Sequence, residues 1–173
     1  MNVKFLNPFV EGAYEVLCSE TGQTVKRGDL RLENDIYQTD DLTVIISLVG
    51  AVVGTVFYSM PQEVAIKLAS ILLGDDLSEL DNLAQSGIAE LGNVITGRAS
   101  TKLSKAGFEC NISTPSLIMG NGASISTLDC PRLVVPLETV AGKLDIHLAL
   151  RQGNDNGLKA PQMAIPSAFQ TTG

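Results

Sequence analysis

A charge-free stretch from residue 42 to residue 58 constrains the fold of this chain most strongly. Its length approaches the lower limit, about 17 residues, for a helix that crosses a membrane. Val, Ile and Thr are frequent in the stretch, and Gly50 and Gly54 interrupt it. Because β-branched residues favour strands, two short strands joined by a turn near Val49-Gly50 explain it better than a membrane span does. The sequence therefore predicts a β-hairpin here and no membrane helix.

Length and charge describe an acidic chain with room for a real core. The chain has 173 residues, which suits one domain, and 45% of them are hydrophobic. Nineteen acidic residues oppose twelve basic ones, giving a net charge of −7, and the basic residues are scattered. Binding to nucleic acid or to an anionic membrane draws on clustered Lys and Arg, so we expect neither.

Cysteine and histidine usage disfavours a metal site. Cys18, Cys110 and Cys130 are widely spaced, no CxxC pair occurs, and His147 is the one histidine. This pattern is typical of a reducing compartment, and residues 1–8 lack the apolar core of a signal peptide, so we expect a cytoplasmic protein. The sequence contains no Walker loop, GxGxxG, GxSxG or HExxH motif, and we expect no cofactor of its own.

Apolar periodicity and end signals predict three helices. Asn7 as N-cap and Pro8 at the first helical position begin the first helix. A second helix begins at Pro61 and stops at Gly74. The third and longest helix runs from about residue 78 to residue 106.

Period-two patterns and turn signals predict the remaining strands. In a hairpin around Ala141-Gly142, Leu144 and Ile146 alternate with His147, which places the histidine on the other face of its strand, where no partner signals a chemical role.

The predicted fold is an α/β domain of the α+β type, over residues 1–151, in which a mostly antiparallel sheet carries the first and third helices as an antiparallel pair on one face. Residues 152–173 form a polar tail that we expect to be loosely packed. The predicted strands are Thr24–Leu32 (with a bulge or turn at Arg27-Gly28), the two of the central hairpin, Phe108–Ile112, Ser116–Met119, Arg132–Glu138 and Lys143–Leu150.

The third helix carries an unusual polar face. At about 100° per residue, Ser86, Glu90, Asn93 and Gly97 fall within roughly 60° of one another. An ordinary solvated face, the usual meaning of such a pattern, would carry long Lys and Glu side chains. A carboxylate can hold a cation on a partner, and an amide can orient a water molecule without changing charge. The small neighbours that we expect to border this polar face are Ala89, Gly92 and Ser100, and the apolar stripe opposite is Leu80, Ala84, Ile88, Leu91, Ile95 and Ala99.

The spacing Ser86-x3-Glu90-x2-Asn93, followed by Pro115, resembles the signature of the CheC/CheX/FliY family of chemotaxis phosphatases. The stretch Glu90-Leu-Gly-Asn93-Val-Ile-Thr-Gly97 is similar to its core. The chain looks most like the CheX branch, because CheC and FliY carry a second copy of the motif in the first helix. Here that helix offers Glu11-x2-Tyr14 and Glu15-x2-Cys18, neither of which ends in Asn.

The resemblance implies a function in two-component signalling. It implies that the chain dephosphorylates a CheY-like response regulator, with Glu90 pairing with the regulator's active-site lysine and Asn93 positioning water for attack on the aspartyl phosphate. It also implies that Ser86, Gly97 and Pro115 shape the site, that Mg²⁺ belongs to the regulator, and that the protein is a homodimer. Two alternatives stay open at this point: a non-catalytic adaptor that binds a signalling partner, and a structural dimer whose polar face is ordinary surface.

Overall fold

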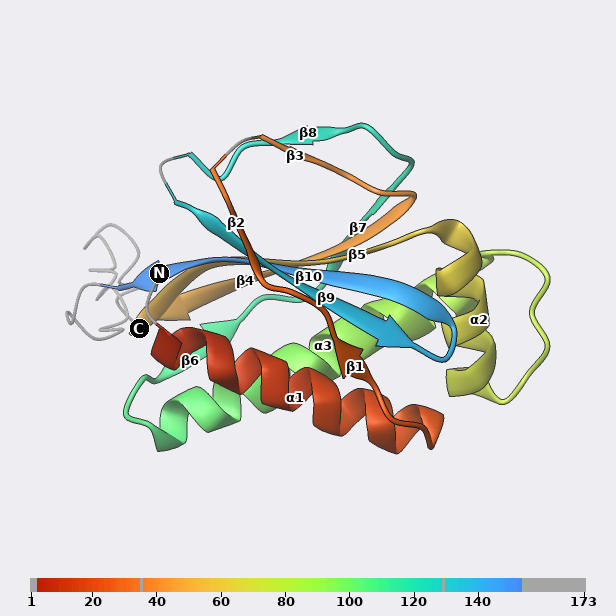
Figure 1. Cartoon of the computed structure of the whole chain (residues 1–173), viewed down its shortest axis with the longest axis horizontal. Helices are drawn as coiled ribbons and strands as arrows, with labels where there is room; N and C mark the ends of the chain where they lie inside the picture. Colours follow the sequence, from red (N-terminus) through yellow and green to blue (C-terminus); the bar gives the residue numbers. More distant parts are fainter. Residues whose placement is uncertain (1–2, 35, 129, 154–173) are drawn as a thin grey trace, which may run out of the picture.

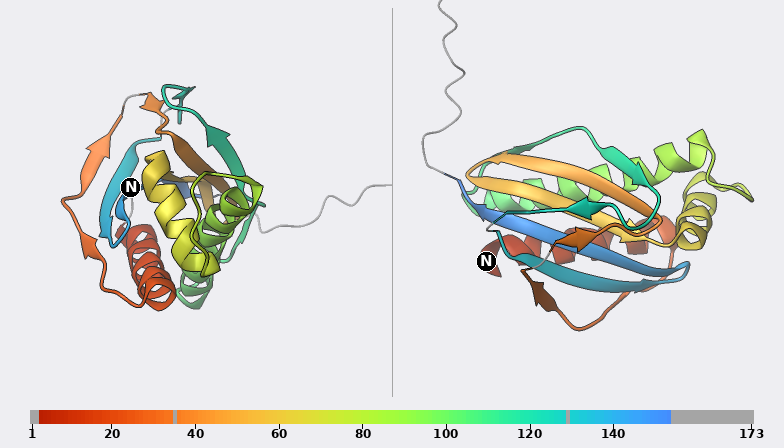
Figure 2. Two further views of the ribbon diagram at one scale, coloured as in Figure 1. Left: turned by 90° about the vertical axis from the view of Figure 1, so that its right-hand side faces the viewer. Right: turned by 90° about the horizontal axis from the view of Figure 1, so that it is seen from above.

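The protein folds as a curved sheet with helices on one face and a small two-stranded addition on the other (Figure 1). The computed structural model describes residues 3–34, 36–128 and 130–153. In the end view of Figure 2 the sheet curves over all three helices. The elements are α1 (Val3–Thr21), β1 (Lys26–Arg27), β2 (Arg31–Glu33), β3 (Tyr37–Gln38), β4 (Leu42–Gly50), β5 (Val52–Met60), α2 (Gln62–Leu73), α3 (Asn82–Lys105), β6 (Cys110–Ile112), β7 (Ser116–Met119), β8 (Ser124–Ile125), β9 (Arg132–Thr139) and β10 (Gly142–Gln152).

The charge-free stretch forms the predicted hairpin at the middle of the sheet. β4 and β5 pair in antiparallel register from Leu42 opposite Met60 to Leu48 opposite Gly54. The sheet order is β1-β9-β10-β5-β4-β6, with β2 also on β9 and β7 also on β4. Every strand pairing in the described part of the chain is antiparallel, which confirms the predicted sheet type. In the same described residues, no helix has the length and apolarity needed to cross a membrane.

The main core lies between the sheet and the helices. Alternate residues of the central strands, such as Val44, Val56 and Ile146, point to the helix side and are fully buried. Helices α1 and α3 pack as the predicted antiparallel pair, with Lys102 Nζ lying 3.1 Å from Glu11 and 2.7 Å from Glu15. The fold class is thereby confirmed.

The helix boundaries differ from prediction at two N-termini. α1 begins at Val3, a turn before Asn7 and Pro8, and Pro8 lies inside it. Burial of Phe5, whose ring meets Phe108 edge-on at 5.2 Å, stabilises this extra turn and offsets the hydrogen bond that proline cannot make. α3 begins at Asn82 rather than near residue 78, because the Asp81 carboxylate caps the helix by accepting from the Ala84 N–H at 2.8 Å.

The other predicted strands are present as β4, β5, β6, β7, β9 and β10, but the first predicted strand is not a single strand. The expected strand at residues 24–32 is two short strands, β1 and β2, both on β9. The interruption starts at Gly28, whose N–H donates to the Pro136 carbonyl at 2.8 Å. Pro136 has no backbone N–H to donate in return, so the strand pairing breaks here. The pair β3 and β8, which packs over the outer face of the sheet, was not predicted. The prediction of a loosely packed tail falls almost wholly on residues 154–173, which lie outside the described residues.

Candidate active site

The buried side of α3 fixes how the helix is rotated on the sheet. At Gly92 an added Cβ would lie 3.1 Å from a Val44 methyl carbon and 3.2 Å from the Tyr58 ring, so glycine lets the helix approach the strands closely. The Thr96 hydroxyl donates to the Gly92 carbonyl at 2.8 Å and lies 2.7 Å from the Tyr58 hydroxyl, which is therefore the donor of that second bond. Burial raises the pKa of Tyr58, so the phenol stays protonated.

This anchoring turns Glu90 and Asn93 outward together. The Glu90 side chain is exposed and that of Asn93 is half-buried. The Asn93 Nδ2 donates to Glu90 Oε2 at 3.3 Å, so carboxylate and amide lie side by side on the outside of the helix. The amide carbonyl and the second carboxylate oxygen leave acceptors that another molecule can use. The structure thus brings together the two residues that the sequence singled out.

The three expected site-shaping residues lie on α3 and in the connection between β6 and β7. Ser86 is exposed one turn before Glu90, and its hydroxyl donates to the Asn82 carbonyl at 2.8 Å. Gly97 is half-buried one turn after Asn93, and an added Cβ would meet only Ile112, at 4.0 Å. Pro115 is half-buried in the connection between β6 and β7, two strands that α3 contacts.

The expected border of small residues is wrong in part. Ala89 and Gly92 are both buried, and the small size of Gly92 serves helix–sheet packing. Ser100 is half-buried, and its hydroxyl donates to the Cys110 carbonyl at 3.0 Å, which ties α3 to β6. The anchoring bond between Tyr58 and Thr96 was not predicted, because nothing in the spacing of two hydroxyl residues 38 positions apart signals their contact.

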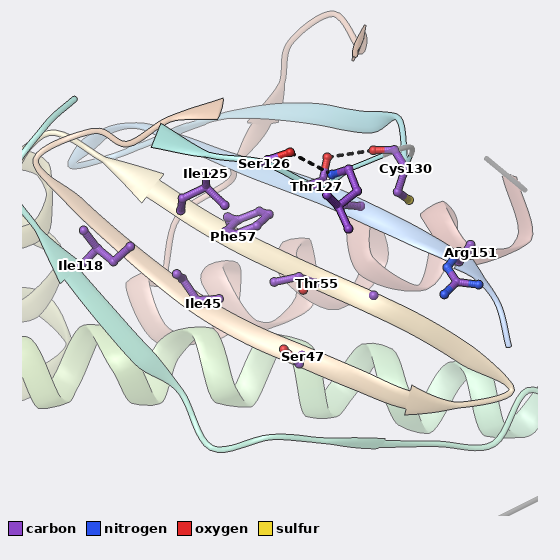
Figure 3. A pocket seen from close by; sticks show the side chains of 13 residues that line it. Ile45, Ser47, Thr55, Phe57, Ile118, Ile125, Ser126, Thr127, Cys130 and Arg151 are labelled. Carbon is purple, nitrogen blue, oxygen red and sulfur yellow. Dashed lines mark hydrogen bonds between the residues drawn. The ribbon is translucent and has the colours of Figure 1, made fainter. Parts of the chain in front are cut away.

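A hollow lies on the opposite face of the sheet from this pair (Figure 3). It measures about 760 Å³ and is lined mainly by apolar and hydroxyl side chains, among them Ile45, Thr55 and Phe57, with Arg151 at one end. In Figure 3 the sheet separates this outer hollow from the helices. The part of the chain that the structure describes has no group of three or more His, Cys, Asp or Glu residues arranged to hold a metal ion.

Comparison with known proteins identifies the family. The family model described as chemotaxis phosphatase CheX matches residues 42–138, which is more than half of the chain and includes β4 through β8, the whole of α3 and all but the last residue of β9. The chain belongs to the CheX family of chemotaxis phosphatases. A curated relative, the CheY-P phosphatase CheX of Thermotoga maritima, is 28% identical over 155 residues, which cover 88% of this chain and 99% of that protein.

Solved CheX-family structures have the same fold. A CheC-like superfamily protein from Shewanella sp. PV-4 is 25% identical, with a TM-score of 0.78 over 87% of this chain and 99% of that one. The CheX of Borrelia burgdorferi, solved in a complex with CheY, BeF3 and Mg²⁺, is 27% identical, with a TM-score of 0.75 over 86% of this chain and 98% of that one. Membership of the CheX family confirms the resemblance carried by Glu90 and Asn93.

Proposed function

We propose that this protein is a response-regulator phosphatase that accelerates loss of the aspartyl phosphate from a CheY-like partner. The observation that carries the proposal is the pair Glu90 and Asn93, held side by side on the outside of α3 in a chain of the CheX family. Support comes from the relatives, one of which is a CheY-P phosphatase and another of which forms a complex with CheY.

Glu90 has the chemistry of a docking residue. Its exposed carboxylate offers an acceptor for a lysine ammonium, and a charge-assisted hydrogen bond of this kind fixes both distance and direction. The bond to Asn93 holds the carboxylate beside the amide, so a partner lysine that pairs with Glu90 also sets the position of Asn93. In this proposal Glu90 aligns the regulator on α3.

Asn93 has the chemistry of a water-positioning residue. An aspartyl phosphate is already reactive, so its hydrolysis needs chiefly an oriented water molecule in line with the bond that breaks. The amide can accept one hydrogen from that water and donate to a neighbouring oxygen, and it carries no charge that would repel the phosphoryl group. Mg²⁺ in this proposal belongs to the regulator, where it neutralises phosphoryl charge. Ser86, Gly97 and Pro115 shape the surface around the pair.

The test is the lifetime of the phosphoryl group on candidate regulators from the same organism. Each regulator is phosphorylated and its decay is timed with and without this protein. At least one regulator is expected to lose its phosphoryl group markedly faster in its presence. If all decay curves coincide with those of the regulators alone, the proposed function is refuted.

Glu90→Ala tests the docking of the regulator separately from the hydrolysis of its phosphoryl group. Loss of a partly desolvated charge pair is expected to weaken association with the regulator by about tenfold or more, measured by titration. The rate at saturating protein is expected to fall less than the affinity, since Asn93 remains. Unchanged affinity in this variant would count against the docking role.

A non-catalytic adaptor is the second candidate. Its supporting observation is that the chain brings no complete catalytic apparatus of its own to α3, so binding without turnover is chemically reasonable. Binding of a phosphorylated regulator without any change in its phosphoryl lifetime would favour the adaptor, and measurable acceleration would remove it.

We also propose a cytoplasmic homodimer. The family resemblance motivates the dimer, and the outer hollow offers apolar surface on the face of the sheet opposite α3. A second copy that packs there would leave Glu90 and Asn93 accessible to the regulator. The molecular mass in solution, measured by light scattering, tests this arrangement.

A further inference from the structure

A groove of about 400 Å³ runs beside Glu90, where α1, α2 and α3 meet. Glu90 forms part of its wall, so the groove and the proposed site share a residue. Leu73 of α2 and Leu83 and Val94 of α3 line it together with the more buried Val16 of α1. We refer to this feature as the Glu90 groove.

Three large aliphatic side chains of the groove are unusually exposed for a water-facing surface. Leu83 is 54% exposed, Val94 39% and Leu73 38%. Scattered single apolar residues are normal on a protein surface, but three that line one concavity form a patch typical of an interaction site. Burying them against an apolar side chain would remove this surface from water.

Gly87 keeps the groove open. It lies on α3 within the groove lining, and an added Cβ would come within 3.8 Å of the Leu73 side chain, an ordinary contact distance. A larger side chain at this position would therefore fill the space between α2 and α3 without colliding with backbone. Glycine here costs helix stability relative to alanine, so the open space has an energetic cost in the free protein.

The charge of the groove is acidic. Glu20 of α1 and Glu90 of α3 both line it, and no Lys or Arg does. Asp75 and Asp76, just after α2, are exposed as well. An occupant that carries a basic group beside its apolar side chain would match this charge, and an acidic one would be repelled.

On α3, Glu90 lies between Asn93 and Val94, a residue of the groove wall. At about 100° per residue, Asn93 lies roughly 60° to one side of Glu90 and Val94 roughly 40° to the other. A partner surface that covers both sides of Glu90 therefore contacts Asn93 and lies over the groove. Resting on the proposed function, we infer that the Glu90 groove receives a large apolar side chain of the response regulator, one that lies next to a basic side chain.

Leu83→Ser and Gly87→Met test this inference in opposite ways. The first removes apolar surface from an exposed position, and the second fills the groove while improving helix propensity, so neither is expected to unfold the protein. The dissociation constant is measured with a regulator that carries beryllofluoride as a stable mimic of the phosphoryl group. Each variant is expected to raise it by about tenfold, as loss of one well-buried aliphatic contact does.

Leu32→Ser is the matched control, because Leu32 on β2 is 58% exposed and lies away from the three-helix junction. It is expected to leave the dissociation constant unchanged. Dissociation constants within twofold of the unaltered protein for both groove variants would overturn the inference.

The failure of this inference is distinguishable from failure of the proposed function. If the unaltered protein binds the regulator and speeds its decay while the groove variants bind equally well, only the groove assignment falls. If the unaltered protein binds the regulator but does not speed its decay, the dissociation constants of the two groove variants still show whether the groove takes part in binding. If the mass in solution changes with Leu83→Ser while regulator binding does not, the groove belongs to a second copy of the chain, and the inference is overturned.

Discussion

Two polar clusters of this protein differ in what surrounds them. Glu90 and Asn93 share one hydrogen bond on the outside of α3, and their remaining acceptors face solvent. Arg132 and His147 lie on the outer face of the sheet, at most 6% exposed, beneath the β3 residue Tyr37. The residue types that most often carry chemistry are thus in the buried cluster, and plainer residues occupy the candidate site.

The side chains of the buried cluster are paired with one another. Arg132 Nε donates to His147 Nδ1 at 3.1 Å, and its guanidinium also pairs with Glu33. The Tyr37 ring centroid lies 4.4 Å from that of His147 and 5.0 Å from the Arg132 guanidinium. Burial, with a contribution from Arg132, lowers the pKa of His147 to about 4, so the ring is neutral near pH 7 and accepts a bond. The contrast teaches that availability to a partner, rather than residue type, distinguishes the proposed site from a structural cluster.

Arg132→Met is expected to have the largest effect on stability. It leaves the His147 Nδ1 acceptor unpaired in a buried place and removes the more buried of the two arginines that pair with Glu33, which should lower the free energy of unfolding by about 3 kcal/mol. Urea denaturation measures this loss, with the exposed Arg27→Met as control. Turnover per folded molecule should not change, and a selective loss of turnover would break the contrast between the clusters.

The pH dependence of stability tests the same cluster. An unfolded His147 takes up a proton as the pH falls below about 6.5, whereas the folded one does so only near pH 4. The unfolded state therefore gains protons first, and stability that is complete above pH 6.5 falls by about 3 kcal/mol as the pH drops to 4. Denaturation of the unaltered protein and of His147→Gln between pH 7 and 5 isolates this contribution, because the variant should lack it. Equal slopes would contradict the buried neutral imidazole.

A pair of matched substitutions sharpens the comparison within α3 itself. Gly92→Val would press its side chain against Val44 and Tyr58, 3.1 and 3.2 Å from the new Cβ, and should lower stability by about 2 kcal/mol. Gly97→Val meets only Ile112 at 4.0 Å and should change stability by less than about 0.5 kcal/mol. Thermal or urea unfolding compares the two. A similar loss of stability at both positions would mean that the polar face of α3 at Gly97 is packed against other atoms.

Sequence patterns predicted the features that depend on local order. The hairpin of β4 and β5, the end of α2 at Gly74, whose left-handed backbone caps the helix, and the outward position of the Glu90 and Asn93 pair all follow from periodicity and turn chemistry. These signals lie within a few residues of the structure that they specify.

Features that depend on distant contacts were not predictable in this way. The start of α1 depends on Phe5 meeting Phe108, about a hundred positions away. The role of Gly92 depends on which residues of β4 and β5 lie beneath it, and helical spacing alone placed it at the edge of the polar face. The Glu90 groove arises where three separate helices meet, so no single segment signals it.

In the proposed function, Asn93 acts on a partner and contributes little to the fold. Asn93→Ala tests it most directly when phosphoryl decay and urea denaturation are measured on the same preparation. The expected result is a loss of at least about a hundredfold in the accelerated decay of the regulator, with the free energy of unfolding unchanged within about 0.5 kcal/mol. Acceleration equal to that of the unaltered protein, with the amide removed and the fold intact, would contradict the claim.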